Sequence, residues 1–261
     1  MGMVMSSFSG QEVSRCQVCG EGPTVRSHLL PRALAHDTRA GSSHLRVGSI
    51  NDDGFETSRA GIFDDGILCD EHEQKLRPFD TYAVKFCRTF DERRADLGEG
   101  RFLIKPVDAD LLVRFAVSVI WRFSVSTRRE SPKVELGAFG KPFQDIVFDS
   151  ASCDREPALI IWANTSELTN LKGFSILPAC GRQLGRRYWS FMVSGISFVL
   201  KVDSQPTHPR VALLPINGRN FILSTFKPFD TSHEFGEMLK IAQRMGRPKP
   251  RPAAAFRPRN A

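Results

Sequence analysis

The chain has 261 residues, of which 41% are hydrophobic and 25% charged, a composition typical of a soluble globular protein with one large or two modest domains. Its longest apolar runs are far shorter than the roughly 20 residues of a membrane-spanning helix. The N-terminus also lacks the pattern of a secretory signal. These features exclude an integral membrane protein, and we expect a cytoplasmic protein with no membrane partner.

The net charge of +7 is unevenly distributed along the chain. Six basic residues and no acid lie in residues 244–261, so the preceding residues carry a net charge of only +1. The same segment is rich in proline and alanine, which predicts a basic disordered tail suited either to solubility or to contact with nucleic acid. Residues 1–14 are small and polar and are expected to form a flexible leader.

The first chemistry-bearing segment after the leader is Cys16-Gln17-Val18-Cys19-Gly20. Cys16 and Cys19 are separated by two residues, and Cys69 and His72 repeat that spacing about 50 residues later. Tetrahedral zinc sites commonly take two such pairs of thiolate or imidazole ligands from separate turns. The spacing therefore predicts structural Zn²⁺ bound by these four residues; the alternative is a set of free core cysteines beside a surface histidine.

Between the two pairs, the sequence predicts a short helix at 31–35, a strand at 45–50, and a returning strand at 61–68 interrupted at Asp64-Asp65-Gly66. From Asp70 to Phe90 the apolar residues recur at intervals of three and four, which indicates a helix. Pro78 predicts either a kink in this helix or two successive helices. The charged stretch 91–107 is the expected domain boundary.

The second half of the chain changes from helical to strand-like patterns. A core helix is expected at 108–126, a shorter helix at 132–149, and a final helix at 232–245. Strands are expected at 158–162, 174–177, 188–193, 196–202, 211–214 and 221–223. The predicted fold is α+β: a small zinc-containing module, then helices, then a mostly antiparallel sheet domain.

His28 lies between the two ligand pairs, in Ser27-His28-Leu29-Leu30-Pro31. A closed zinc site needs no fifth ligand, so His28 is free for other chemistry or is a capping or core-satisfied histidine. Arg26 and Arg32 flank it and are either phosphate contacts or surface charges.

Together these segments resemble the HNH endonuclease superfamily in its zinc-stapled form. The likeness is closest to a bacterial branch with S-H-x-x-P in the middle, C-E at the end, and an acid seven residues after that Glu. It rests on Cys16–Cys19, on Ser27 to Pro31, on Cys69-x-x-His72-Glu73 and on Asp80. Ile120-Trp121-Arg122 extends the likeness to about residue 126.

The resemblance implies a ββα-metal module within residues 15–100; the patterns described above add a domain of unknown role at 101–243 and the tail at 244–261. It implies that His28 is the general base and that Glu73 occupies a catalytic-metal position, assisted by Asp80. Mg²⁺ or Mn²⁺ would be the catalytic ion and DNA the substrate.

The sequence departs from the family pattern at Ser27, which replaces the Asp that binds the catalytic metal. Serine is a poorer ligand for a hard cation, and Glu73 could compensate for it. The alternative function is a non-catalytic zinc module that binds nucleic acid or a protein partner. The sheet domain could then hold a homodimer or dock that partner.

Overall fold

The structure is a computed structural model. It describes residues 14–37, 45–47, 56–58, 61–128, 131–168, 170–173, 175–232, 236 and 240. The expected basic tail, nearly all of the expected leader and most of the helix expected at 232–245 lie outside the described residues. No helix in the described part of the chain is long and apolar enough to span a membrane.

The first third of the chain forms an antiparallel hairpin followed by a long helix. Strands β1 and β4 pair so that Ser27 lies opposite Asp64 and His28 opposite Phe63, and α2 begins two residues after β4 ends. A separate two-stranded sheet of β2 and β3 falls between them in sequence. The elements are β1 (Val25–His28), α1 (Arg32–Asp37), β2 (Leu45–Val47), β3 (Glu56–Ser58), β4 (Phe63–Leu68) and α2 (Asp70–Arg88).

Two details of this region differ from the sequence-based expectation. Strand β4 continues through Asp64-Asp65-Gly66, because the Gly66 amide donates to the Asp64 carboxylate at 2.8 Å while the strand stays paired with β1. Helix α2 contains Pro78 in its interior and is one helix, so the prediction of two successive helices is wrong.

The second part of the chain is built around a seven-stranded sheet with the order β5-β6-β11-β7-β10-β9-β8. Only the β11–β7 pair is parallel, which confirms the prediction of a mostly antiparallel sheet. Its strands are β5 (Arg94–Gly98), β6 (Arg101–Ile104), β7 (Leu159–Thr165), β8 (Ser175–Gln183), β9 (Arg186–Val193), β10 (Ile196–Lys201) and β11 (Ile222–Pro228).

The strand expected at 211–214 is wrong. Residues Pro209–Val211 form a 3₁₀ turn, and the His208 ring accepts a hydrogen bond from the Arg210 amide. A proline in the first turn and a side-chain cap before it favour such a turn over an extended strand.

Strands β5 and β6 lie in the charged stretch 91–107, where the sequence predicts a domain boundary. The turn that joins them contains Gly98, Glu99 and Gly100, all with positive φ. Phe102 and Ile104 of β6 are fully buried in the same apolar cluster as side chains from α2. The division of the chain into two domains stays a prediction.

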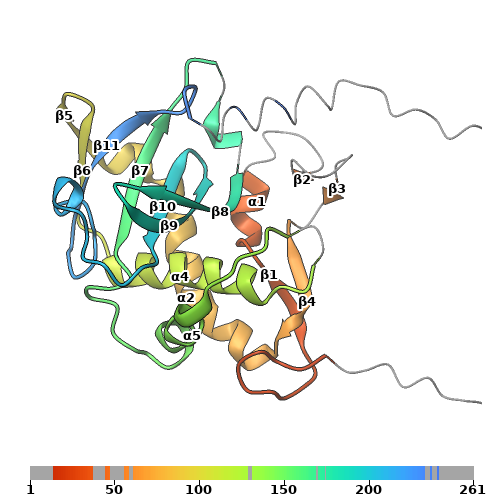
Figure 1. Cartoon of the computed structure of the whole chain (residues 1–261). Helices are drawn as coiled ribbons and strands as arrows, with labels where there is room; N and C mark the ends of the chain where they lie inside the picture. The colour runs from red at the N-terminus through yellow and green to blue at the C-terminus, as the bar shows by residue number, and fades with distance from the viewer. Residues whose placement is uncertain are drawn as a thin grey trace, which may run out of the picture.

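Helix α4 (Ala109–Val125) occupies the centre of the molecule and is buried almost all round. Phe115 packs edge-on against Phe191 and Phe198 of the sheet, with ring centroids 5.9 and 5.3 Å away. Figure 1 shows the β1–β4 hairpin and the large sheet on opposite sides of α2 and α4. The remaining helices are α3 (Phe90–Arg93), η1 (Gly137–Phe139), α5 (Gly140–Phe148) and η2 (Leu171–Gly173).

Candidate metal centre and catalytic cleft

The structure brings Cys16, Cys19, Cys69 and His72 together, with their ligand atoms all within 4.8 Å of one another. Cys69 Sγ lies 3.2 Å from His72 Nδ1 and 3.9 Å from Cys19 Sγ, and Cys16 Sγ lies 3.7 Å from the same imidazole nitrogen. Tetrahedral zinc with bonds of about 2.3 Å to sulfur sets its ligand atoms roughly 3.7 Å apart. This cluster could hold a metal ion, and its donor set and geometry fit zinc.

Local backbone geometry places both ligand pairs. The first pair sits on a tight turn in which the Gly20 amide donates to the Cys16 carbonyl at 2.8 Å, and Gly20 takes a φ of +75°. The Gln17 amide donates to the Ile67 carbonyl at 2.9 Å, which ties this turn to β4. Cys69 is the residue before α2 and His72 lies in its first turn, so a helical spacing of three puts them on the same side.

The pKa values of the Cys16 and Cys19 thiols are shifted by their close neighbours. Burial raises the pKa of the Cys16 thiol, but backbone N–H groups of Cys19, Cys69 and Val18 outweigh it, so this pKa is lowered overall. The Cys19 thiol accepts from the Glu21 amide, yet burial and its two sulfur neighbours raise its pKa overall. Mutual repulsion of this kind is expected where several thiolates converge, and a bound cation would relieve it.

The surroundings of His72 favour its neutral form. Its ring packs edge-on against Phe148 with centroids 5.4 Å apart. Burial first, and then the charge of Lys75, lower the pKa of the imidazole. A neutral imidazole is the form that binds metal, so the environment of His72 suits a ligand role.

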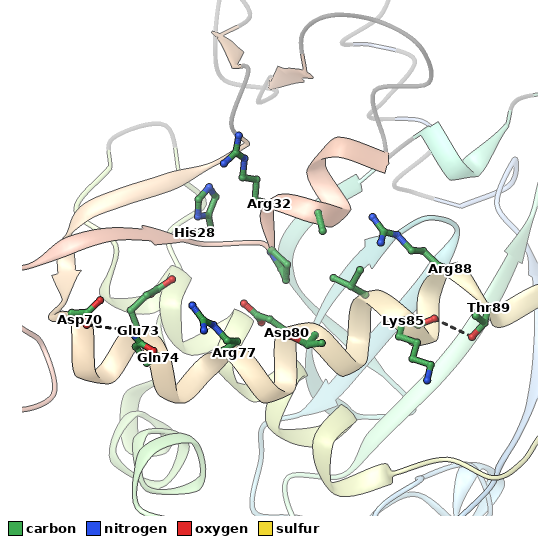
Figure 2. A pocket seen from close by; sticks show the side chains of 14 residues that line it. His28, Arg32, Asp70, Glu73, Gln74, Arg77, Asp80, Lys85, Arg88 and Thr89 are labelled. Carbon is green, nitrogen blue, oxygen red and sulfur yellow. Dashed lines mark hydrogen bonds between the residues drawn. The ribbon is translucent and has the colours of Figure 1, made fainter.

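A cleft of about 620 Å³ runs along α2 beside the metal cluster. Glu73 and Asp80 line it from α2 and point toward the facing wall, where His28 and Arg32 lie (Figure 2). The structure therefore brings the three residues expected at the catalytic site, His28, Glu73 and Asp80, to one cavity.

Glu73 is the most unusual group in this cleft. Its Oε2 atom is buried and has no hydrogen-bond partner among the described residues, and the neighbouring Ser27 is fully buried. Burial is the main cause that raises the pKa of the Glu73 carboxyl; the nearby Arg122 charge, the Ser27 hydroxyl and the His28 amide lower it only in part. A buried carboxylate oxygen without a donor is costly unless a cation satisfies it.

Asp80 is paired with a cation from another helix. Both of its oxygens accept hydrogen bonds from the Arg122 guanidinium, at 3.0 and 2.9 Å, and Arg122 is completely buried. Arg122 also donates to the backbone carbonyl of His28 at 2.6 Å. Sequence reasoning noted Arg122 only through the family likeness and did not connect it to either residue.

Sequence reasoning also missed the cations on the cleft side of α2. Arg77 and Lys85 line the cleft with Arg32, and none of the three forms an ion pair with any described residue. Arg88 lines it too but is paired with Asp37 at 2.8 Å. The signal was present in the sequence, since residues 73, 77, 80, 84 and 88 share one side of a helix.

Two other residues near the site have structural roles. Arg26 is not among the residues that line the cleft; its guanidinium stacks over Phe63 at 4.1 Å and forms a 3.5 Å ion pair with Asp65. Asp64 is buried and accepts hydrogen bonds from the Gly66 amide, from the Ser126 hydroxyl and from the residue-127 amide and hydroxyl. Asp64 thus fastens β4 to the end of α4.

Comparisons with known proteins add no assignment to this geometry. The chain was compared with protein-family models, with curated proteins and with solved structures, and none of the three comparisons gave a match. Functional inference therefore depends on the metal cluster and the cleft themselves.

Proposed function

We propose that this chain is a metal-dependent endonuclease of HNH type that hydrolyses phosphodiester bonds in DNA. His28 is the proposed general base, and Glu73 the proposed ligand of a catalytic Mg²⁺ or Mn²⁺ ion. The observation that carries the proposal is the meeting of these two residues in one cleft, where the Glu73 carboxylate has a buried oxygen that accepts no hydrogen bond from any described residue.

The residues fit the implied ion in chemistry as well as in place. Divalent Mg²⁺ and Mn²⁺ prefer oxygen ligands, and Glu73 offers a carboxylate beside the buried hydroxyl of Ser27. When bound, such an ion would supply Lewis-acid stabilisation of negative charge on the phosphate. The pKa of Glu73 is raised by burial, so a cation would also favour its ionised form.

His28 has the position that a general base needs. It is the last residue of β1, it is only half-buried, and it lines the cleft next to the carboxylate of Glu73. A neutral imidazole can accept a proton from water, and the hydroxide so formed would attack phosphorus while the P–O bond to the leaving sugar oxygen breaks. Arg32, Arg77 and Lys85 supply positive charge along the same cleft, which suits a polyanionic backbone.

The Cys16–His72 cluster has a structural role in this proposal. Bound Zn²⁺ would join the turn before β1 to the first turn of α2, and Glu73 is the residue after the ligand His72. The metal would therefore fix the start of the helix that carries Glu73 relative to the strand that carries His28.

Nicking of supercoiled plasmid in Mg²⁺ and in Mn²⁺ tests the proposal. We expect wild-type protein to nick the plasmid and His28→Ala to lose at least 100-fold in rate, the order of a lost general base. His36→Ala is the matched control, because His36 is an exposed histidine on α1 that does not line the cleft. Equal nicking by wild type and His28→Ala, with proteins of equal purity, would refute the role of His28.

The buried Ser27 favours one alternative, a nucleic-acid-binding module without catalysis. Ser27 occupies the strand position where a carboxylate would bind the ion, and it is completely buried. This alternative predicts salt-sensitive DNA binding with no cleavage in any divalent metal, and weaker binding after removal of residues 244–261. Restored cleavage in Ser27→Asp would show that the serine alone had removed catalysis.

A further inference from the structure

We infer that Asp80 and Arg122 form a positioning pair that holds the His28 end of β1 against α2, and that Asp80 acts through Arg122 instead of binding the catalytic ion. This inference rests on the proposed function. It assigns a role to Arg122, which lies 94 residues from His28 in sequence and contacts its backbone.

The hydrogen bonds of Arg122 use the whole guanidinium group. Nη1 donates to the His28 carbonyl and to one Asp80 oxygen, and Nη2 donates to the other Asp80 oxygen and to the Ser118 hydroxyl. Nε donates to the Ser118 carbonyl at 3.3 Å. An arginine side chain has five N–H donors in a rigid fork, and each has an acceptor here.

The acceptors of this fork lie on three separate elements. His28 is the last residue of β1, Asp80 lies in the middle of α2, and Ser118 lies one turn before Arg122 on α4. Arg122 therefore fixes the three elements to one another at a point next to the cleft. The Leu29 amide, which follows the bonded carbonyl, donates to the Ile62 carbonyl at 2.9 Å, so the peptide after His28 is held from both sides.

This arrangement separates Asp80 from Glu73 in function. Both oxygens of Asp80 accept hydrogen bonds from a cation, whereas one buried oxygen of Glu73 has no donor in the part of the chain that the structure describes. A carboxylate whose negative charge already compensates a completely buried guanidinium has less charge to offer a metal ion. Asp80 is therefore best explained as the group that holds Arg122 in place.

The test uses the full-length protein with Asp80→Asn and Arg122→Lys. Asparagine keeps the shape of Asp80, and lysine keeps the charge of Arg122 but has only three donors. We expect both variants to lose at least tenfold in maximal nicking rate, while the Mn²⁺ concentration for half-maximal rate changes less than twofold. Asp110→Asn is the matched control, because Asp110 pairs with Arg114 on the same helix at 2.7 Å without contacting β1.

Hydrogen exchange provides a readout that does not depend on cleavage. We expect amides in residues 25–30 to exchange at least tenfold faster in Asp80→Asn than in wild type, and amides in the strands of the large sheet to be unchanged. Because Asp80→Asn leaves the buried Arg122 charge uncompensated, Asp80→Asn/Arg122→Gln serves as a neutral pair if that variant fails to fold. It should show the same local exchange and the same loss of rate.

The outcomes separate this inference from the proposed function. A tenfold or larger rise in the half-saturating Mn²⁺ concentration for Asp80→Asn alone would identify Asp80 as a metal ligand and overturn the inference. An unchanged nicking rate would overturn it as well. If wild-type protein does not nick at all, the proposed function fails, and the exchange of residues 25–30 alone decides: faster exchange supports the positioning pair and unchanged exchange refutes it.

Discussion

Replacing Cys69 by serine tests the metal cluster directly. Cys69 Sγ lies 3.9 Å from the sulfur of Cys19 and 3.2 Å from the imidazole nitrogen Nδ1 of His72. Serine is nearly isosteric but is a poor ligand for zinc. We expect Cys69→Ser to lose most of its bound zinc and to be much less stable.

The expected loss of folding stability follows from the length of the chain loop that a bound metal would close. Cys19 and Cys69 are 50 residues apart in sequence. For a cross-link across a loop of about 50 residues, the chain-entropy relation gives about 4 kcal/mol at 25 °C. Zinc in small domains contributes up to the order of 10 kcal/mol, so 4 kcal/mol is the lower expectation. For a chain of this size it corresponds to a fall in melting temperature of roughly 8–16 °C.

The assay combines metal content with thermal unfolding. Zinc is measured on purified wild type and Cys69→Ser by mass spectrometry of the metal, and unfolding is followed by circular dichroism with and without a chelator. Cys180→Ser is the control, because Cys180 is exposed on β8 and lies outside the cluster. Equal zinc content and equal melting temperatures in wild type and Cys69→Ser would refute the assignment of the cluster.

Two further predictions concern stability and binding. Burial raises the pKa of the Asp64 carboxyl, but the hydrogen-bond donors around it outweigh burial, so its pKa is lowered overall. The ionised carboxylate therefore stabilises the fold at pH values above its ordinary pKa of 3.8. This stabilisation is lost as the pH falls through the lower pKa of the folded state. Asp64→Asn should cost about 2–3 kcal/mol in urea unfolding at pH 7 and remove this acid-dependent loss; an unchanged unfolding midpoint would contradict it. Arg77→Gln and Lys85→Gln should each weaken DNA binding and lower the slope of log affinity against log salt by about 1, measured by fluorescence anisotropy. Exposed Arg155→Gln, away from the cleft lining, should leave that slope unchanged.

The sequence was sufficient to predict the metal cluster because ligand chemistry is encoded in spacing. Two pairs of metal-ligand residues, each with two residues between its members, indicate a four-ligand site whatever the conformation of the chain between them. The structure has all four ligand atoms within 4.8 Å of one another. The core helix was predictable for a similar reason: its apolar residues recur with the helical period, and α4 is buried as expected.

The β5–β6 hairpin could not be predicted from local pattern. All five residues of β5 are exposed, and its polar–apolar alternation, Arg94-Ala95-Asp96-Leu97, covers only four residues, too few to predict a strand. Only Phe102 and Ile104 of β6 are buried, and two apolar residues do not distinguish a strand from a loop. Pairing with β11, a strand more than 100 residues away, stabilises the hairpin as part of the sheet.

The contact between Asp80 and Arg122 beside the cleft could not be predicted from the sequence for a different reason. Asp80 and Arg122 are 42 residues apart, and each lies on a helix whose period predicts only which side faces the core. Arg122 occupies a position on the buried side of α4, where an apolar residue is expected, and that exception was the available signal. A buried arginine needs acceptors for its five donors, but the sequence alone does not say which elements supply them.

The position of Arg122 also gives the large sheet a part in the proposed catalysis. Helix α4 packs against the sheet through Phe115 and reaches His28 through Arg122, two turns further along the same helix. The sheet therefore supports the helix that fixes the proposed base, although no residue of the seven strands lines the cleft of about 620 Å³. If the positioning pair is correct, a cavity-forming change such as Phe198→Ala at the α4–sheet contact should lower nicking only through loss of folded protein. The rate per folded molecule should then stay the same as long as the bonds of Arg122 to His28 and Asp80 remain.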